Sequence, residues 1–232
     1  MVVFALALHT LGCKDDSEAT SKNGYVNGWV RTEAGEPLRN VRIIIDHSIF
    51  FNSNITASTN EMGEYKVKVP NGSWYAFAQY QISAYGENYK FYMSPTDPTG
   101  FGGEGGVRNF TWKLTGTMPE PLSGYFGGLI TLDNLPGVYI PVNEIEFQLN
   151  PRRALIDGSQ GEFLRLRTSD NYQLHDVPIG QYTLTATYNG KPVMFREWNT
   201  NGAFRTNYDL KFKAQVPGHC DNCAKLEYYW EP

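Results

Sequence analysis

The chain contains 232 residues and carries a formal net charge of −4, from 20 basic and 24 acidic side chains. This balance excludes the basic surface expected of a nucleic-acid-binding protein and the polybasic patch of a protein that binds anionic membranes. The length suits one large or two medium-sized domains, each able to bury its own core. Aromatic residues make up 14% of the chain, and short alternating runs between glycine and proline turns predict an all-β protein.

The first segment has the pattern of a bacterial lipoprotein signal. Seven apolar residues, Val2–Leu8, are followed by Gly12-Cys13 and then by a charged stretch. Seven residues are too few to span a bilayer, which needs about 20, but they suit the apolar part of a signal peptide. We predict a signal peptide over residues 1–12, a lipid on Cys13 and a polar tether over residues 13–22. The alternative is a buried strand with an incidental cysteine. No stretch of the sequence predicts a transmembrane helix.

Residues 13–16, Cys-Lys-Asp-Asp, resemble the export signal of Bacteroidota surface lipoproteins, in which a lysine and two acidic residues follow the cysteine. The resemblance implies an outer-membrane lipoprotein that is exposed on the cell surface. If Cys13 carries lipid, the two remaining cysteines, Cys220 and Cys223, leave no odd thiol. That count suits an oxidising, extracytoplasmic setting.

Alternating apolar and polar residues predict strands in the first half of the chain. Residues 41–45 read Val-Arg-Ile-Ile-Ile, and residues 65–69 read Tyr-Lys-Val-Lys-Val. A period of two places one face of a strand in a core and the other in water. The tight turn Pro70-Asn71-Gly72 then leads into an aromatic strand over residues 74–80.

The second half repeats these features in the same order, which predicts a duplicated domain. The matched segments are Gly24–Gly28 with Gly124–Gly128, Pro37–Ile45 with Pro141–Leu149, Val69–Trp74 with Val177–Tyr182, and Phe110–Leu114 with Tyr208–Phe212. The offset stays between 98 and 108 residues, as expected when loops change length around fixed strands. The alternative is two unrelated β domains that share common turn residues.

Two motifs in the first half have the pattern of a known family. Residues 28–41 read Gly-Trp-Val-Arg-Thr-Glu-Ala-Gly-Glu-Pro-Leu-Arg-Asn-Val, and residues 59–72 read Thr-Asn-Glu-Met-Gly-Glu-Tyr-Lys-Val-Lys-Val-Pro-Asn-Gly. Together they resemble the carboxypeptidase regulatory-like domain over about residues 24–114. The resemblance implies a transthyretin-like, seven-stranded β-sandwich that is a non-catalytic module in most members. The second half is a looser copy.

We therefore expect two tandem transthyretin-like (prealbumin-like) Greek-key β-sandwiches after the lipoprotein signal. The first spans residues 23–115 and the second residues 122–232. Residues 116–121, Gly-Thr-Met-Pro-Glu-Pro, form a short linker that its prolines stiffen.

The sequence contains no motif that predicts catalysis. Beyond the signal, the histidines are His47, His175 and His219, and none belongs to a zinc-protease, nucleophile-elbow or Walker motif. The glycine-rich segment 100–106 lacks the lysine and the helix of a phosphate-binding loop, so we interpret it as a long loop. We expect a non-enzyme that uses no cofactor.

His219-Cys220-Asp-Asn-Cys223 is the sharpest local cluster of reactive residues. We favour a disulfide between Cys220 and Cys223 that pins the final strand. The alternatives are free thiols, a zinc site in which His219 is a third ligand, and a redox site. Zinc needs a fourth ligand, and a thioredoxin-type site needs a helix after the motif.

Aromatic residues crowd the segment that follows the Pro-Asn-Gly turn. Both faces of one strand cannot lie in a single core, so at least one set of rings is expected at the surface, where rings stack on sugars or peptides. The alternative is that long loops bury them. The candidate ligand-binding residues are Trp74, Tyr75, Phe77, Tyr80, Tyr85 and Tyr89.

These observations support three hypotheses for function. The first is a non-catalytic, surface-anchored binding or scaffold lipoprotein, with a glycan as the first candidate ligand. The second is a structural or adhesive accessory subunit that docks envelope proteins through sheet edges or loops. The third is a small metal or redox site at Cys220 and Cys223. We expect attachment to the outer membrane through the lipid anchor and no nucleic-acid partner.

Overall fold

The computed structural model describes residues 24–168 and 172–232, and β-strands make up nearly all the regular structure in them. The predicted signal peptide, the lipid-bearing Cys13 and the polar tether up to residue 22 lie outside the described residues. Within the described part, the helical structure is a single 3-10 turn, Val142–Glu144, and no helix is long and apolar enough to cross a membrane. The predicted all-β sandwich fold is confirmed.

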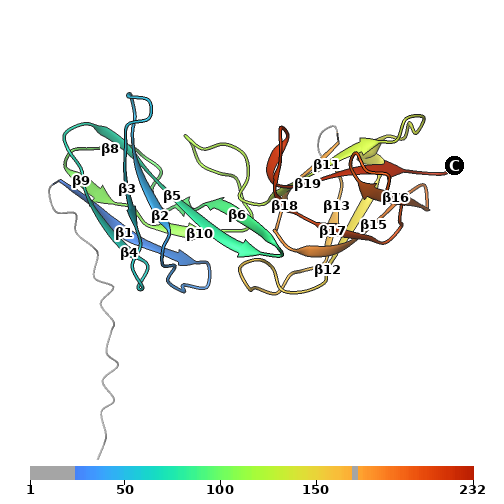
Figure 1. Cartoon of the computed structure of the whole chain (residues 1–232), viewed down its shortest axis with the longest axis horizontal. Helices are drawn as coiled ribbons and strands as arrows, with labels where there is room; N and C mark the ends of the chain where they lie inside the picture. Colours follow the sequence, from blue (N-terminus) through green and yellow to red (C-terminus); the bar gives the residue numbers. More distant parts are fainter. Residues whose placement is uncertain (1–23, 169–171) are drawn as a thin grey trace, which may run out of the picture.

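Two five-stranded sheets form the first half of the molecule (Figure 1). One sheet has the order β4-β1-β10-β7, with β9 beside β1, and the other has the order β3-β2-β5-β6, with β8 beside β5. The strands of the first sheet are β1 (Tyr25–Thr32), β4 (Glu64–Lys68), β7 (Ser94–Pro95), β9 (Gly105–Val107) and β10 (Phe110–Trp112). Those of the second are β2 (Arg42–His47), β3 (Asn54–Ser58), β5 (Ser73–Ala84), β6 (Glu87–Tyr92) and β8 (Phe101–Gly102).

The alternating pattern of the sequence accounts for the core of this first sandwich. Val26 and Val30 of β1 and Ile43 and Ile45 of β2 are completely buried, while the residues that alternate with the buried ones along each strand are only partly buried or exposed. Each such side chain contributes about 1.5–3 kcal/mol when it leaves water. Two facing apolar stripes therefore bring the two sheets together.

The second half forms one continuous nine-stranded sheet with the order β13-β12-β15-β16-β19-β11-β14. Strand β17 lies beside β15, and β18 lies beside β19. Strand β16 pairs with β15 through residues 191–193 and with β19 through residues 194–197, so it joins the two layers of this half. The strands are β11 (Gly128–Asn134), β12 (Glu146–Pro151), β13 (Leu164–Leu166), β14 (Gln173–Val177), β15 (Gln181–Tyr188), β16 (Lys191–Glu197), β17 (Tyr208–Lys211), β18 (Lys213–Val216) and β19 (Cys220–Tyr229).

Strand pairing is repeated between the two halves. Strand β1 is antiparallel to β4 and parallel to β10, and β11 is likewise antiparallel to β14 and parallel to β19. Strand β2 lies between β3 and β5, and β12 lies between β13 and β15. The same partners in the same directions support the duplication that the sequence anchors indicated.

One of the predicted correspondences is wrong. The sequence matched Phe110–Leu114 with Tyr208–Phe212, but β10 is parallel to β1, whereas β17 is antiparallel to β15. The partner that β11 takes in parallel is β19, which is therefore the counterpart of β10. Alternation of aromatic or leucine residues with lysine occurs in many half-buried strands, so that pattern does not identify the neighbouring strand.

The segment between the two sandwiches is folded back on itself. The N–H of Met118 donates to the carbonyl of Gly124, and the N–H of Phe126 donates to the carbonyl of Gly116, both at 2.9 Å. Residues 116–126 thus form a small hairpin, of which the predicted linker, residues 116–121, is the first arm.

The carboxylate of Asp176, in β14, holds the base of this hairpin. It accepts the N–H of Gly116 at 2.8 and 2.9 Å and the N–H of Gly127 at 3.1 Å. A carboxylate that accepts several backbone N–H groups forms stronger hydrogen bonds than a neutral acceptor. Asp176 therefore holds both arms of the hairpin at its base, one of them the start of the linker.

Candidate functional site

The six candidate aromatic residues do not form one exposed strip. Trp74 and Tyr89 are 4% and 0% exposed, so the prediction that they present their rings to a ligand is wrong. The indole N–H of Trp74 donates to the carbonyl of Pro70 at 3.1 Å, which uses its one polar group inside the fold. Tyr80 packs edge-on against the buried Trp112, with ring centroids 5.1 Å apart. Trp74 and Tyr89 therefore belong to the core, and Tyr80 is partly buried against it.

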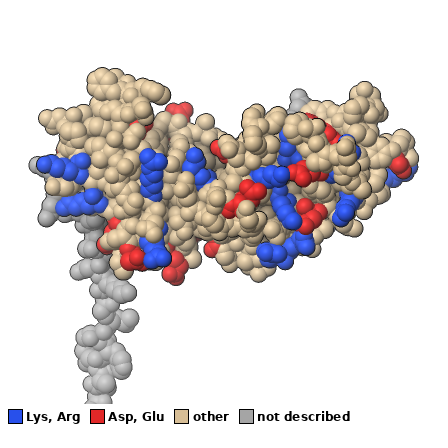
Figure 2. Space-filling model, in the orientation of Figure 1, with Lys and Arg blue, Asp and Glu red and all other residues tan. Residues whose placement is uncertain are grey.

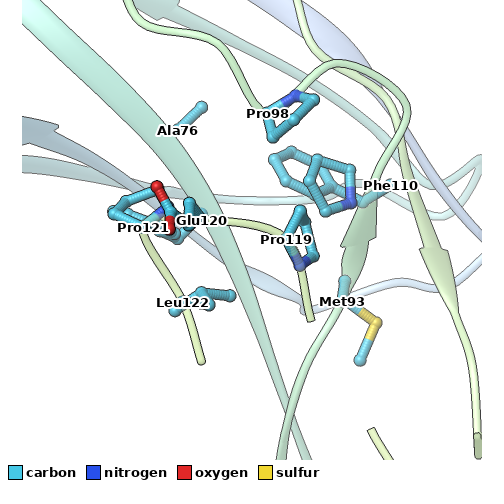
Figure 3. A pocket seen from close by; sticks show the side chains of 10 residues that line it. Ala76, Met93, Pro98, Phe110, Pro119, Glu120, Pro121 and Leu122 are labelled. Atoms are coloured by element: carbon cyan, nitrogen blue, oxygen red, sulfur yellow. The ribbon is translucent and has the colours of Figure 1, made fainter. Parts of the chain in front are cut away.

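Tyr75 and Phe77 remain half-buried on the outer face of β5, with their ring centroids 6.4 Å apart and their planes at 28°. Phe77 also lines a small apolar hollow between the first sandwich and the linker (Figure 3). In that view the linker residue Pro119 lies near Phe110, whereas Pro121 lies on the other side of the hollow, beside Glu120. Their role in ligand binding stays a prediction.

Tyr85, the last candidate, lies with Tyr89 at the junction of the two sandwiches. Tyr85 occupies the two-residue turn between β5 and β6 with φ of 54°, a left-handed conformation, and Gly86 follows at 83°. The hydroxyl of Tyr85 donates to the carbonyl of Ala154 at 3.0 Å, and that of Tyr89 donates to the carbonyl of Phe212 at 2.6 Å. These rings were predicted to bind a ligand and instead connect the two halves of the chain.

Further hydrogen bonds cross the same junction. The N–H of Ala214 donates to the carboxylate of Glu87 at 3.3 Å, and the amide of Asn222 donates to the carbonyl of Lys90 at 2.8 Å. Figure 1 shows the edge strand β6 facing β18 where the two sandwiches meet. The second sandwich thus covers an edge that would otherwise expose backbone groups.

Burial changes the acidity of the junction tyrosine. Burial, followed by the negative charge of Glu87, raises the pKa of Tyr89 to about 12. The phenol therefore keeps its proton across the physiological range and remains a hydrogen-bond donor to Phe212.

Cys220 and Cys223 form a disulfide at the start of β19. Val216 and Lys213 of β18 lie opposite these two cysteines, so the disulfide sits within the β18–β19 hairpin. His219 packs edge-on against the ring of Trp198, with centroids 4.9 Å apart. In this state neither sulfur is a thiolate, so the zinc alternative, with His219 as a third ligand, does not fit the geometry. Among the described residues, no group of three or more His, Cys, Asp or Glu side chains converges on a metal position.

The clearest exposed feature is one that the sequence analysis missed. The β2–β3 hairpin ends in Ile49, Phe50 and Phe51, whose exposures are 76%, 63% and 101%. We call these three residues the hairpin tip. Three adjacent apolar residues at a strand end, where a polar turn is expected, are the signal that would have found it. Isolated exposed apolar residues are ordinary, but a contiguous cluster marks an interaction site.

The side chain of His47 fixes the backbone of the hairpin tip by hydrogen bonds. Its Nδ1 accepts the backbone N–H groups of Ile49 and Phe50 at 3.1 and 3.2 Å. Its ring lies against Phe50 at 4.6 Å and edge-on to the buried Trp74 at 4.7 Å. The histidine thus satisfies backbone donors of the loop and connects the tip to the core.

The segment that carries the hairpin tip is uncharged. Residues 48–60 contain no lysine, arginine, aspartate or glutamate. Figure 2 shows the part of the surface where this hairpin projects without blue or red atoms, whereas charged side chains are spread over the body below it. The tip can therefore enter an apolar pocket without stripping water from a charge.

No family model and no curated protein matches the chain. Among solved structures, the chain is similar to the Bacillus anthracis TIE protein, at 13% identity and a TM-score of 0.31, over 89% of this chain and 34% of that one. It thus spans about a third of the length of that protein.

Two pilin subunits give similarly loose matches. The major pilin T-13 of Streptococcus pyogenes has 10% identity and a TM-score of 0.27, over 90% of this chain and 96% of that one. A D312A variant of BcpA, the major pilin subunit of Bacillus cereus, has 10% identity and a TM-score of 0.26, over 89% of this chain and 99% of that one. These likenesses are too loose to carry an argument about function. The carboxypeptidase regulatory-like assignment stays an expectation from the sequence.

Proposed function

We propose that this chain is a non-catalytic surface module that docks a partner protein through its hairpin tip. The observation that carries the proposal is the exposure of Ile49, Phe50 and Phe51 on a loop that His47 holds in place. Burial of each of these side chains in a partner would contribute about 1.5–3 kcal/mol. A few apolar anchors of this kind supply most of the energy of many interfaces.

A protein pocket suits the hairpin tip better than a membrane surface. Residues 48–60 contain no lysine or arginine, so nothing in this segment attracts anionic lipid headgroups. In this proposal a lipid on Cys13 attaches the chain to the outer membrane, and the polar tether separates the sandwiches from it. The junction also supports the proposal of a surface module, because Tyr85, Glu87 and Tyr89 connect the two sandwiches by hydrogen bonds.

A glycan is the second candidate ligand, and the rings of Tyr75 and Phe77 favour it. They lie side by side on the outer face of β5 and are half-buried, as rings that stack on sugars are. A glycan array probed with the wild type and with Tyr75→Ala separates the two candidates. Binding that the substitution removes supports the glycan, and an array without hits leaves the protein-docking proposal.

Photo-crosslinking on cells tests the docking proposal. Phe51 is replaced by p-benzoylphenylalanine in the full lipidated chain, and the control carries the same residue at Tyr139, which is 87% exposed on the second sandwich. We expect position 51 to yield a discrete cross-linked protein and position 139 to yield none. Adding Ile49→Ser and Phe50→Ser should remove the product. Equal yields at the two positions, or a product that survives these substitutions, would overturn the proposal.

A further inference from the structure

Strand β3 forms an outer edge of its sheet and pairs with β2 alone among the described strands. Its sequence, Asn-Ile-Thr-Ala-Ser, contains no charge and no proline, and its register with β2 is regular over all five residues. Other edges are protected by charge. Strand β4 carries Glu64, Lys66 and Lys68, and β13 carries Arg165. Exposed edges normally carry charges, prolines or bulges that prevent pairing with another chain, and β3 carries none of these.

The register of β3 determines which of its backbone groups are free. Residues 47 and 53 are joined by a backbone hydrogen bond, and so are residues 41 and 59. In an antiparallel ladder, hydrogen-bonded residue pairs alternate with unbonded ones. Counting every second residue between 53 and 59, Ile55 and Ala57 are therefore the residues of β3 that bond to β2. The N–H and C=O groups of Asn54, Thr56 and Ser58 therefore point to the open edge.

From this edge we infer that β3 pairs antiparallel with β3 of a second copy of the chain, with Thr56 opposite Thr56 on the twofold axis. Asn54 of each copy then lies opposite Ser58 of the other. Three bonded pairs satisfy all the outward backbone groups, and two five-stranded sheets join into one sheet of ten. The inference rests on the proposed docking role and names the partner as a second copy.

The side chains around this edge are self-complementary. A threonine opposite a threonine is a favourable cross-strand pair. In β2, Arg42 lies opposite Ser58 and Asp46 lies opposite Asn54. Each of the two outer rows that span both copies therefore has Arg42 on one copy and Asp46 on the other. No like charges meet on the two paired strands.

The exposed apolar residues follow the same symmetry. The hairpin tip lies beyond one end of β3, and Met62, 64% exposed, lies in the turn beyond the other end. Antiparallel pairing brings the tip of each copy to the Met62 turn of the other. The interface is small beside the roughly 1,600 Å² of a stable complex, so we expect a weak dimer that forms where lipid anchors concentrate the chain.

Cysteine cross-linking tests the register. In a bonded antiparallel pair the two Cα atoms are about 5.5 Å apart, within the reach of a disulfide. The full chain with Cys13→Ser, which removes the lipid acceptor, receives Thr56→Cys. The control receives Thr187→Cys, an exposed position on β15 that has a strand on each side. Under mild oxidation we expect a covalent dimer from Thr56→Cys and monomer from Thr187→Cys.

Sedimentation equilibrium of two further variants tests the pairing without a covalent bond. Thr56→Pro removes an N–H that β2 does not use, so the fold should persist while two bonds across the interface are lost. We expect the dimer constant to weaken about thirtyfold, and Thr56→Val to leave it nearly unchanged. Unchanged thermal unfolding would show that Thr56→Pro still folds.

If Thr56→Cys gives no more dimer than Thr187→Cys, the inference is overturned, even if Phe51 cross-links another protein and the docking proposal stands.

Discussion

The hydroxyl of Tyr89, on β6 of the first sandwich, donates a hydrogen bond of 2.6 Å to the carbonyl of Phe212 in the second. The tyrosine is completely buried, and Phe212 is 2% exposed. Neither group can exchange this bond for one to water without separating the sandwiches. This pair therefore couples two domains that are far apart in the sequence.

Tyr89→Phe should loosen the junction while leaving each sandwich intact. The change leaves the carbonyl of Phe212 buried without this donor, which costs about 1–3 kcal/mol. We expect the first unfolding transition to move to lower temperature in calorimetry, together with a broader distribution of sizes in small-angle scattering. Tyr125→Phe, at a tyrosine that is 43% exposed, is the control and should change neither quantity. An unaltered transition in Tyr89→Phe would show that the junction does not depend on this bond.

Alkaline pH should destabilise the protein through its buried tyrosines. Burial raises the pKa of Tyr89, Tyr208 and Tyr228 to about 12, and it also raises the pKa of Tyr65 and Tyr182. In the unfolded chain these phenols lose their protons near pH 10, whereas the folded chain retains them. The unfolded state then binds fewer protons, so the free energy of unfolding falls as the pH rises from about 10 to 12 and is constant below that window.

Spectroscopic titration checks this dependence. Phenolate absorbance should rise in two steps, exposed tyrosines first and buried ones together with the loss of β-sheet circular dichroism. A single step near pH 10 with the fold retained would contradict the burial of these groups.

Opening the disulfide between Cys220 and Cys223 should have a modest effect. The two cysteines are three positions apart, and closing so short a loop removes little entropy from the unfolded chain, about 2 kcal/mol by the chain-entropy relation. We expect the double substitution Cys220→Ser and Cys223→Ser to lower the melting temperature by a few degrees without unfolding the second sandwich. Reduction of the wild type by dithiothreitol should reproduce the shift. Complete unfolding on reduction would mean that the disulfide does more than pin the β18–β19 hairpin.

Asp176→Asn should release the linker hairpin. Asparagine tolerates the φ of 59° at this position. It has one neutral oxygen in place of the two oxygens of a charged carboxylate, so the hydrogen bonds from the N–H groups of Gly116 and Gly127 weaken. We expect proteases to cut within residues 116–126 several times faster than in the wild type, as mass spectrometry of the fragments would show. Asp133→Asn, which removes the ion pair between the partly exposed Asp133 and Lys225, is the matched control and should leave cleavage within residues 116–126 unchanged.

Two substitutions should separate the roles of His47 as a hydrogen-bond acceptor and as an aromatic packing partner. His47→Asn keeps an acceptor for the N–H groups of Ile49 and Phe50, whereas His47→Phe keeps the aromatic contact with Trp74 and loses the acceptor. We expect amide hydrogen exchange at residues 49 and 50 to accelerate about tenfold or more in His47→Phe and much less in His47→Asn. Equal acceleration in the two variants would assign the effect to packing.

The strands of both halves could be predicted from sequence because burial repeats every second residue. Residues 41–45 and 65–69 read as half-buried strands, and the structure places them in facing sheets. The correspondence of Tyr208–Phe212 with Phe110–Leu114 could not be judged in this way, because alternation records a buried face and not a neighbouring strand. The aromatic residues illustrate the same limit. Tyr75 and Tyr89 are the same residue type and both lie in strands, but Tyr89 is buried and Tyr75 is half-buried.

The sequence by itself determined the all-β architecture and the repeated order of strands, because local periodicity and turn residues carry that information. Only the tertiary structure decided which aromatic rings lie in the junction, that the linker is one arm of a hairpin, and that Ile49, Phe50 and Phe51 stay in water. These properties depend on which distant segments meet in space. A side chain's neighbours across a sheet or a domain boundary leave no periodic trace along the chain.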